Sequence, residues 1–133
     1  MDNVVAVVGA GTLRSSRPDA VDFPHRWTDE GVTVETTFTG AHLLHLAVAG
    51  CVLNDVYREA LSLGVDLSGV RVTADGGFDP DSWQTTGITY VVEIDSAAPV
   101  GDIESLLVTV DAVAEIPKAI RLGGDVTRRD DST

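Results

Sequence analysis

The sequence has one cysteine, few aromatic residues and few basic residues. Cys51 is the single cysteine among 133 residues, so the chain cannot form an internal disulfide, and we expect it in the reducing cytoplasm. Nine Lys and Arg stand against 21 Asp and Glu, a formal net charge of −12, which argues against partners such as nucleic acid or an anionic membrane surface. No apolar run approaches the roughly 18 residues of a membrane span, and the N-terminal residues lack the basic stretch of a secretion signal.

The rest of the composition is that of a folded protein. Hydrophobic residues make up 44% of the chain, and Gly and Pro are unremarkable in number. At this length we expect one domain over residues 1–133. Residues 1–28 would form an N-terminal strand and loop, and residues 128–133 a frayed tail.

Short β-branched or alternating segments predict several strands, and Gly-rich or polar segments predict the turns between them. The expected strands are Asn3–Val8, Val32–Phe38, Val70–Ala74, a strand through Ile88, Tyr90, Val92 and Ile94, and Ala119–Val126 with a bulge at Gly123-Gly124. For Val32–Phe38 a loop with a short strand is the alternative. The expected turns and loops are Gly9-Ala10-Gly11, Arg14–Asp22, Asp75-Gly76-Gly77 and Asp79–Gln84.

A long helix is expected over residues 41–63, with Thr39 or Gly40 at its start and Gly64 at its end. Its first half is apolar on all sides and should be buried, whereas its second half carries polar residues, Asp55 among them, and should reach solvent. A second helix should begin at Gly101-Asp102 and end at Pro117.

This order of elements predicts an α+β fold with an antiparallel sheet against a long central helix. One short sheet covers one side of a helix, so a helix that is apolar on all sides needs a second cover. We therefore expect a homodimer, with a second copy of the chain against the helix.

Two patterns that resemble ligand sites are better explained without a ligand. Gly9-Ala10-Gly11 follows a strand but is not followed by a helix, and Arg14 stands where a dinucleotide fingerprint needs its third glycine. His42 and His45 share one helix face, but two histidines without a nearby carboxylate make a poor metal site. We therefore expect neither a cofactor nor a metal.

Cys51 is the main candidate for chemistry. Asp55, Arg58 and Ser62 follow it on one stripe of the helix; Arg58 would favour a thiolate and Asp55 would oppose it. A cysteine in the middle of a helix also lacks the help of a helix N-terminus. The residues alone therefore favour a packing role for Cys51 over a catalytic one.

The segment Gly40–Cys51 and its continuation to Val56 resemble the OsmC/Ohr superfamily, the osmotically inducible protein C-like and organic hydroperoxide resistance proteins. The resemblance continues in the same order along the chain and covers roughly Asp29 to Thr127. Asp29-Glu30 is similar to the acidic pair before the family helix, and Gly64–Val72 to the connection from helix to strand. Asp102–Ala114, followed by Ile116-Pro117, is similar to the element that carries the second cysteine in a Cys-Pro motif.

The resemblance implies an intertwined homodimer in which antiparallel sheets wrap the central helices, and reduction of organic hydroperoxides by a cysteine pair. Cys51 matches the peroxide-attacking position, but Ile116 stands in place of the second cysteine and His42 in place of the helix glutamate. Arg14 is the nearest candidate for the activating arginine, with Arg17 and Arg26 as alternatives.

Two functions remain open at this point. In the first, an apolar pocket at the dimer interface around Cys51, with His42 and Ile116, binds or transforms a small organic molecule. In the second, Cys51 with Arg14 is a one-cysteine thiol peroxidase that reduces an organic hydroperoxide and is regenerated by an external thiol. A scaffold without any ligand is the third, plainer alternative.

Overall fold

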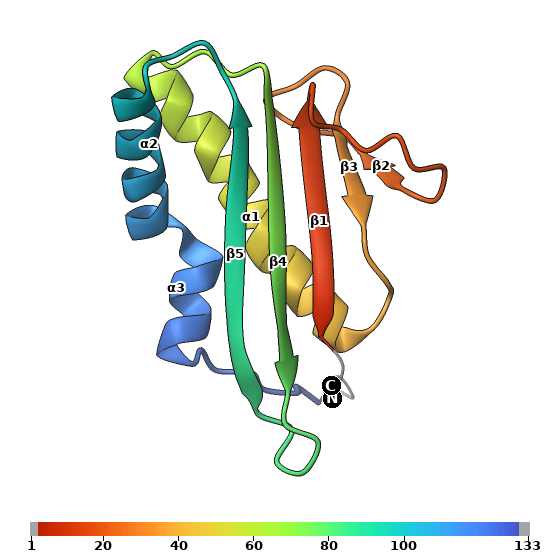
Figure 1. The fold of residues 1–133 in the computed structure, drawn as a ribbon. Coiled ribbons are helices and arrows are strands. Elements are labelled where there is room, and N and C mark those ends of the chain that lie inside the picture. The colour runs from red at the N-terminus through yellow and green to blue at the C-terminus, as the bar shows by residue number, and fades with distance from the viewer. Residues whose placement is uncertain (1–2, 131–133) are drawn as a thin grey trace.

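Residues 3–130 are described in a computed structural model, in which five strands form one sheet and three helices pack beside it (Figure 1). The elements are β1 (Val4–Gly11), β2 (Val21–Phe23), β3 (Val32–Glu35), α1 (Gly40–Leu63), β4 (Gly69–Phe78), β5 (Thr85–Asp95), α2 (Val100–Val113) and α3 (Glu115–Leu122). Residues 131–133 of the expected tail, and residues 1 and 2, lie outside the described part.

The sheet has the strand order β2-β3-β1-β4-β5, and each neighbouring pair is antiparallel. The N-terminal strand β1 is its centre, because Val8 pairs with Val34 of β3 on one side and with Val72 of β4 on the other. All three valines are buried against the helical layer. The predicted α+β fold with an antiparallel sheet is thus confirmed.

Two predicted turns are instead parts of long strands. Gly9-Ala10-Gly11 remains in β1, and Gly11 ends the strand with φ +61°, where an added Cβ would lie 2.2 Å from the carbonyl oxygen of Ser68. Asp75-Gly76-Gly77 continues β4, because β5 pairs with its backbone. The residue pattern within one segment does not reveal such a pairing. The turn falls later, where Asp79 Oδ1 accepts backbone hydrogen bonds from Asp81 and Ser82.

Helix α1 lies across one face of the sheet and begins and ends at the predicted caps (Figure 1). The hydroxyl of Thr39 accepts a hydrogen bond from the backbone N–H of His42 at 3.1 Å. Gly64 closes the helix in the left-handed region at φ 70°. Val48, Val52 and Val56 recur at four-residue spacing and fill the core between α1 and the sheet.

The burial of α1 differs from the prediction in both halves. Ala47 in the first half is exposed, since the sheet of one chain covers only one side of the helix. Asp55 in the second half is 2% exposed rather than solvated, and its Oδ1 pairs with Arg58 at 3.2 Å. The ion pair with Arg58 offsets the cost of removing the Asp55 carboxylate from water.

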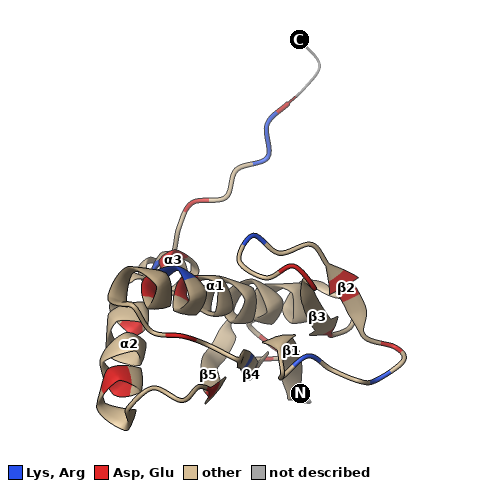
Figure 2. Cartoon of the chain, turned by 90° about the horizontal axis from the view of Figure 1, so that it is seen from above, with Lys and Arg blue, Asp and Glu red and all other residues tan. Residues whose placement is uncertain are grey.

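The C-terminal region is helical where a strand was predicted. α2 ends at Val113, and Pro117 lies in the first turn of α3, where a missing backbone N–H costs no helical hydrogen bond. Ile116 and Ile120 pack on the core at the four-residue spacing of a helix. Residues 124–130 have no regular secondary structure and extend away from the sheet and helices (Figure 2).

Among the described residues, no helix combines the length and the apolar character needed to cross a membrane.

Candidate functional site

A cavity of about 500 Å³ lies beside α1, between the sheet and the start of α3. Most of its wall is apolar and comes from five elements (β1, β2, β3, α1 and α3) and the segment that joins β2 to β3; representative residues are Val8, Phe23, Trp27, Val32, Leu46 and Ile116. A few polar side chains also reach it: His25, Arg26, Cys51, Asn54, Asp55 and Glu115. An apolar concave surface with a few convergent polar groups is typical of a small-molecule site.

Cys51 contributes to the wall of this cavity from the middle of α1 and is 9% exposed. The first residues of α3 lie against it, and hydrogen bonding from the backbone of Ile116 and of Glu115 favours its thiolate. The expectation that this thiol lacks a helix N-terminus was therefore wrong, because the N-terminus comes from another helix. Burial nevertheless raises the pKa of the Cys51 thiol above its usual value, and the carboxylates of Asp55 and Glu115 add to the increase.

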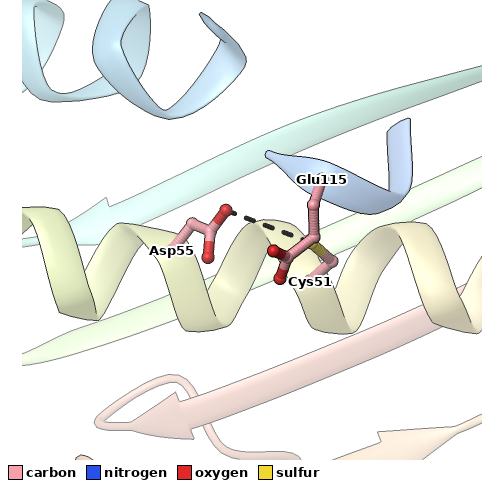
Figure 3. A group of neighbouring side chains, drawn as sticks. All are labelled: Cys51, Asp55 and Glu115. Atoms are coloured by element: carbon pink, nitrogen blue, oxygen red, sulfur yellow. Dashed lines mark hydrogen bonds between the residues drawn. The ribbon is translucent and has the colours of Figure 1, made fainter. Parts of the chain in front are cut away.

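Asp55 and Glu115 approach the thiol from two sides (Figure 3). Asp55 lies one turn beyond Cys51 in α1, with Oδ2 at 4.0 Å from the sulfur. Glu115 is the first residue of α3 and is exposed. Burial raises the pKa of Asp55, partly offset by the Arg58 guanidinium and reinforced by the negative charge of Glu115.

A histidine with partners on both ring nitrogens lies at another part of the cavity wall. His25 Nε2 lies 3.0 Å from Asn54 Oδ1, and Nδ1 lies 2.8 Å from the hydroxyl of Thr28. Since the amide oxygen accepts, Nε2 carries the proton and Nδ1 accepts from Thr28. Burial lowers the pKa of His25, partly offset by the hydrogen bond that Nε2 donates to Asn54. The ring also packs edge-on against Tyr57, with centroids 5.3 Å apart.

Of the three candidate arginines, the one that lines the cavity is Arg26, an alternative candidate, and not Arg14, the nearest candidate by sequence. Arg26 lines the cavity and lies over the Trp27 ring at 5.7 Å from its centroid. Arg14 lies elsewhere, where its guanidinium pairs with Asp22 and Glu30. Arg17 pairs with Asp19 and Glu35. The single chain therefore brings Cys51 and Ile116 together, but not Cys51 and Arg14.

The two histidines of α1 also lie away from Cys51. The Nδ1 atom of His42 lies 2.7 Å from the hydroxyl of Thr39, and His42 is not among the residues of the cavity wall. His45 is fully buried and donates from Nδ1 to the carbonyl oxygen of Ala41 at 2.7 Å. Each histidine thus has a local partner near the start of the helix, and the two do not converge on a shared ligand.

The sequence reasoning missed Glu115, His25 and Trp27 as site residues. Glu115 could have been noticed because it directly precedes Ile116, the residue at the position of the second family cysteine. His25 and Trp27 had no such signal, because they lie in an irregular segment whose position depends on the packing of β2 and β3.

Comparison with known proteins gives no sequence match: no family model matches the chain, and no curated protein matches it. Solved structures do match its shape. An OsmC-like protein from Mycoplasma pneumoniae shares 12% identity over 80% of this chain and 88% of its own, with a TM-score of 0.57. An OsmC-like hydroperoxide resistance protein from Jannaschia sp. CCS1 shares 18% identity over 98% of this chain and 96% of its own, with a TM-score of 0.50. The chain therefore has the fold of the OsmC-like proteins.

Proposed function

We propose that this protein binds a small organic molecule in the cavity at Cys51 and does not run a two-cysteine peroxidase cycle. The observation that carries the proposal is the cavity itself, about 500 Å³ with a largely apolar wall and a few polar groups. Phe23, Trp27 and Ile116 would contact the apolar body of the ligand. Arg26 and the His25–Asn54 pair would contact its polar groups.

The surroundings of Cys51 support a departure from two-cysteine chemistry. Ile116 lines the cavity with Cys51, at the position where the family resemblance places the second cysteine, so a sulfenic acid on Cys51 has no thiol to resolve it within the chain. The raised pKa keeps the thiol mainly protonated near neutral pH, and the thiolate is the nucleophilic form.

A second copy of the chain is part of this proposal. Ala47 on α1 and Phe23 of β2 are apolar, exposed and on the rim of the cavity. Leu46 and Gly50 extend the same surface as half-buried residues. A homodimer that covered this surface would remove apolar area from water and enclose the ligand. The cytoplasmic location expected from the single cysteine remains part of the proposal.

Trp27 provides a direct test of ligand binding. Of the two tryptophans, Trp83 is 70% exposed in the β4–β5 turn, so Trp83→Phe leaves Trp27 as the reporter in the cavity wall. We expect the apolar probe 1-anilinonaphthalene-8-sulfonate to bind this variant saturably, with energy transfer from Trp27.

Gly50 offers a matched pair of variants for the same test. It lines the cavity, and a Cβ added there would meet no heavy atom within 4 Å. Gly50→Leu should fill the space and weaken probe binding by about tenfold or more, whereas Gly50→Ala should bind nearly as the parent does. Light scattering on both variants checks that the oligomeric state is unchanged. Equal probe affinity in both would place the probe elsewhere and reject the proposal.

A one-cysteine thiol peroxidase is the second candidate, favoured by the backbone hydrogen bonding from the start of α3 to Cys51. The thiolate sulfur would attack one peroxide oxygen, the O–O bond would break, and the alcohol would leave with a proton. One external thiol would then form a mixed disulfide and release water, and a second would free Cys51.

The peroxidase candidate is tested with cumene hydroperoxide in equimolar amount. It requires rapid addition of one oxygen per chain, trapped by dimedone on Cys51, at a rate well above that of a free cysteine. A rate equal to that of free cysteine would reject it.

A further inference from the structure

We infer that Cys51, Asp55 and Glu115 form a binding site for a borderline-soft divalent cation such as Zn²⁺. Each residue offers one ligand atom, and the three atoms lie within 4.8 Å of one another (Figure 3). Cys51 and Asp55 are one turn apart on α1, and Glu115 is the first residue of α3. The site therefore depends on the contact between these two helices.

The donor set indicates which cation fits. A thiolate together with two carboxylates suits Zn²⁺, which accepts sulfur and oxygen ligands at tetrahedral positions. Mg²⁺ and Ca²⁺ prefer oxygen ligands alone, and more of them. Three protein ligands would leave one position of a tetrahedron open.

The burial and charge of the three side chains also fit a bound cation. Asp55 is 2% exposed and Cys51 is 9% exposed, so both acidic groups are largely removed from water. Arg58 contacts Asp55 Oδ1, whereas Oδ2 is turned toward the thiol. Within residues 3–130, Glu115 has no ion pair. A dication would balance the thiolate and the two carboxylates together with the one guanidinium.

Because the cluster lines the cavity, a cation bound there would be in contact with the molecules that the cavity holds. All three residues line the cavity, so an ion could enter from it, and its open position would face it. Binding would replace the thiol proton by the metal: the S–H bond breaks, the S–metal bond forms and the proton goes to solvent. The open position could then accept a water molecule or an oxygen atom of a molecule in the cavity.

Cobalt provides a spectroscopic test on the chelator-treated 133-residue chain. We expect one equivalent of Co²⁺ per chain to produce a near-ultraviolet thiolate-to-metal charge-transfer band and a visible spectrum of four-coordinate intensity. Zn²⁺ should displace it. Binding should release one proton per ion at neutral pH and should protect Cys51 from alkylation.

Variants distinguish Co²⁺ binding at this site from Co²⁺ binding to surface carboxylates. Cys51→Ser should abolish the charge-transfer band, and Glu115→Gln should weaken Co²⁺ binding by about tenfold or more. Glu104→Gln, an equivalent change at an exposed residue of α2, should bind as the parent does. Gly50→Leu should also retain Co²⁺, so failure of the small-molecule proposal is distinguishable from failure of this one. The inference is overturned if the parent shows no charge-transfer band, or if Cys51→Ser binds Co²⁺ equally tightly.

Discussion

The Oδ2 atom of Asp55 lies 4.0 Å from the sulfur of Cys51, one helical turn further along α1. Both side chains are largely buried, so the negative charge of one opposes ionisation of the other. The start of α3 adds backbone hydrogen bonds that favour the thiolate, but also the carboxylate of Glu115, which disfavours it. Burial, which raises the pKa of Cys51 most, thus sets the protonation of this thiol together with four groups from two helices.

Glu115→Gln should lower the pKa of Cys51 and speed its alkylation at neutral pH, since the change removes a negative charge but leaves the α3 backbone in place. The measurement is the iodoacetamide rate as a function of pH. Glu104→Gln serves as control and should leave the profile unchanged. A pKa of Cys51 that stays the same or rises in Glu115→Gln would contradict the arrangement in Figure 3.

Stability should fall at alkaline pH partly because of Cys51. Its pKa is raised in the folded state, so the native chain holds this proton more tightly than the unfolded chain. The stability that results from this tighter proton binding is fully present below the thiol pKa of the unfolded chain. It is lost as pH rises through the thiol pKa of the folded chain. In urea unfolding, the free energy of unfolding should fall less between pH 7 and pH 10 for Cys51→Ser than for the parent. An identical loss in both would show that this thiol is not the group responsible.

Ile116→Cys should form a disulfide with Cys51 under mild oxidation. Both residues line the same cavity, and the backbone of Ile116 hydrogen-bonds the Cys51 thiol, which agrees with the roughly 7 Å upper limit between Cα atoms of a disulfide. Intact mass should fall by two protons per chain, and peptide mapping should link residues 51 and 116. Leu122→Cys, at the other end of α3, should stay reduced. Two free thiols in Ile116→Cys would show that position 116 does not match the second family cysteine.

Leu106→Ala should reduce the free energy of unfolding by about 3 kcal/mol. Leu106 is fully buried and joins α2 to the core on α1, so its removal leaves a cavity. Val108→Ala on the same helix changes a residue that is 71% exposed and should cost less than about 0.5 kcal/mol. Denaturant unfolding measures both. Equal effects would mean that α2 does not pack as described.

Ala47→Asp should convert a dimer to a monomer without unfolding it. Ala47 is exposed in the single chain, so a charge there is costly only if a second copy covers it. Ala112→Asp, the same change on exposed α2, should remain a dimer. Light scattering and circular dichroism would follow mass and fold. A parent protein that is monomeric at micromolar concentration would remove the dimer from the proposed function.

Local sequence signals predicted α1 and its two caps, because Thr39 and Gly64 act on the backbone beside them. They failed at Asp75-Gly76-Gly77 and at Ala119–Val126. In the first case pairing with β5 keeps Gly76 in a strand, and in the second the packing of Ile116 and Ile120 on the core favours α3. Both outcomes depend on residues distant in sequence, which periodicity within one segment does not detect.

The class of fold, the acidic composition, the single thiol and the absence of a second cysteine at position 116 could be predicted from the sequence alone. Each of these follows from residue identity or from hydrophobic spacing along one segment. The surroundings of Cys51, in contrast, depend on how the elements pack in three dimensions. The approach of α3 to α1 places Glu115 beside the thiol, and the fold of the sheet directs Arg26 rather than Arg14 to the cavity. Burial and electrostatic interactions depend on distances in space, and these arise only when the helices and strands pack together.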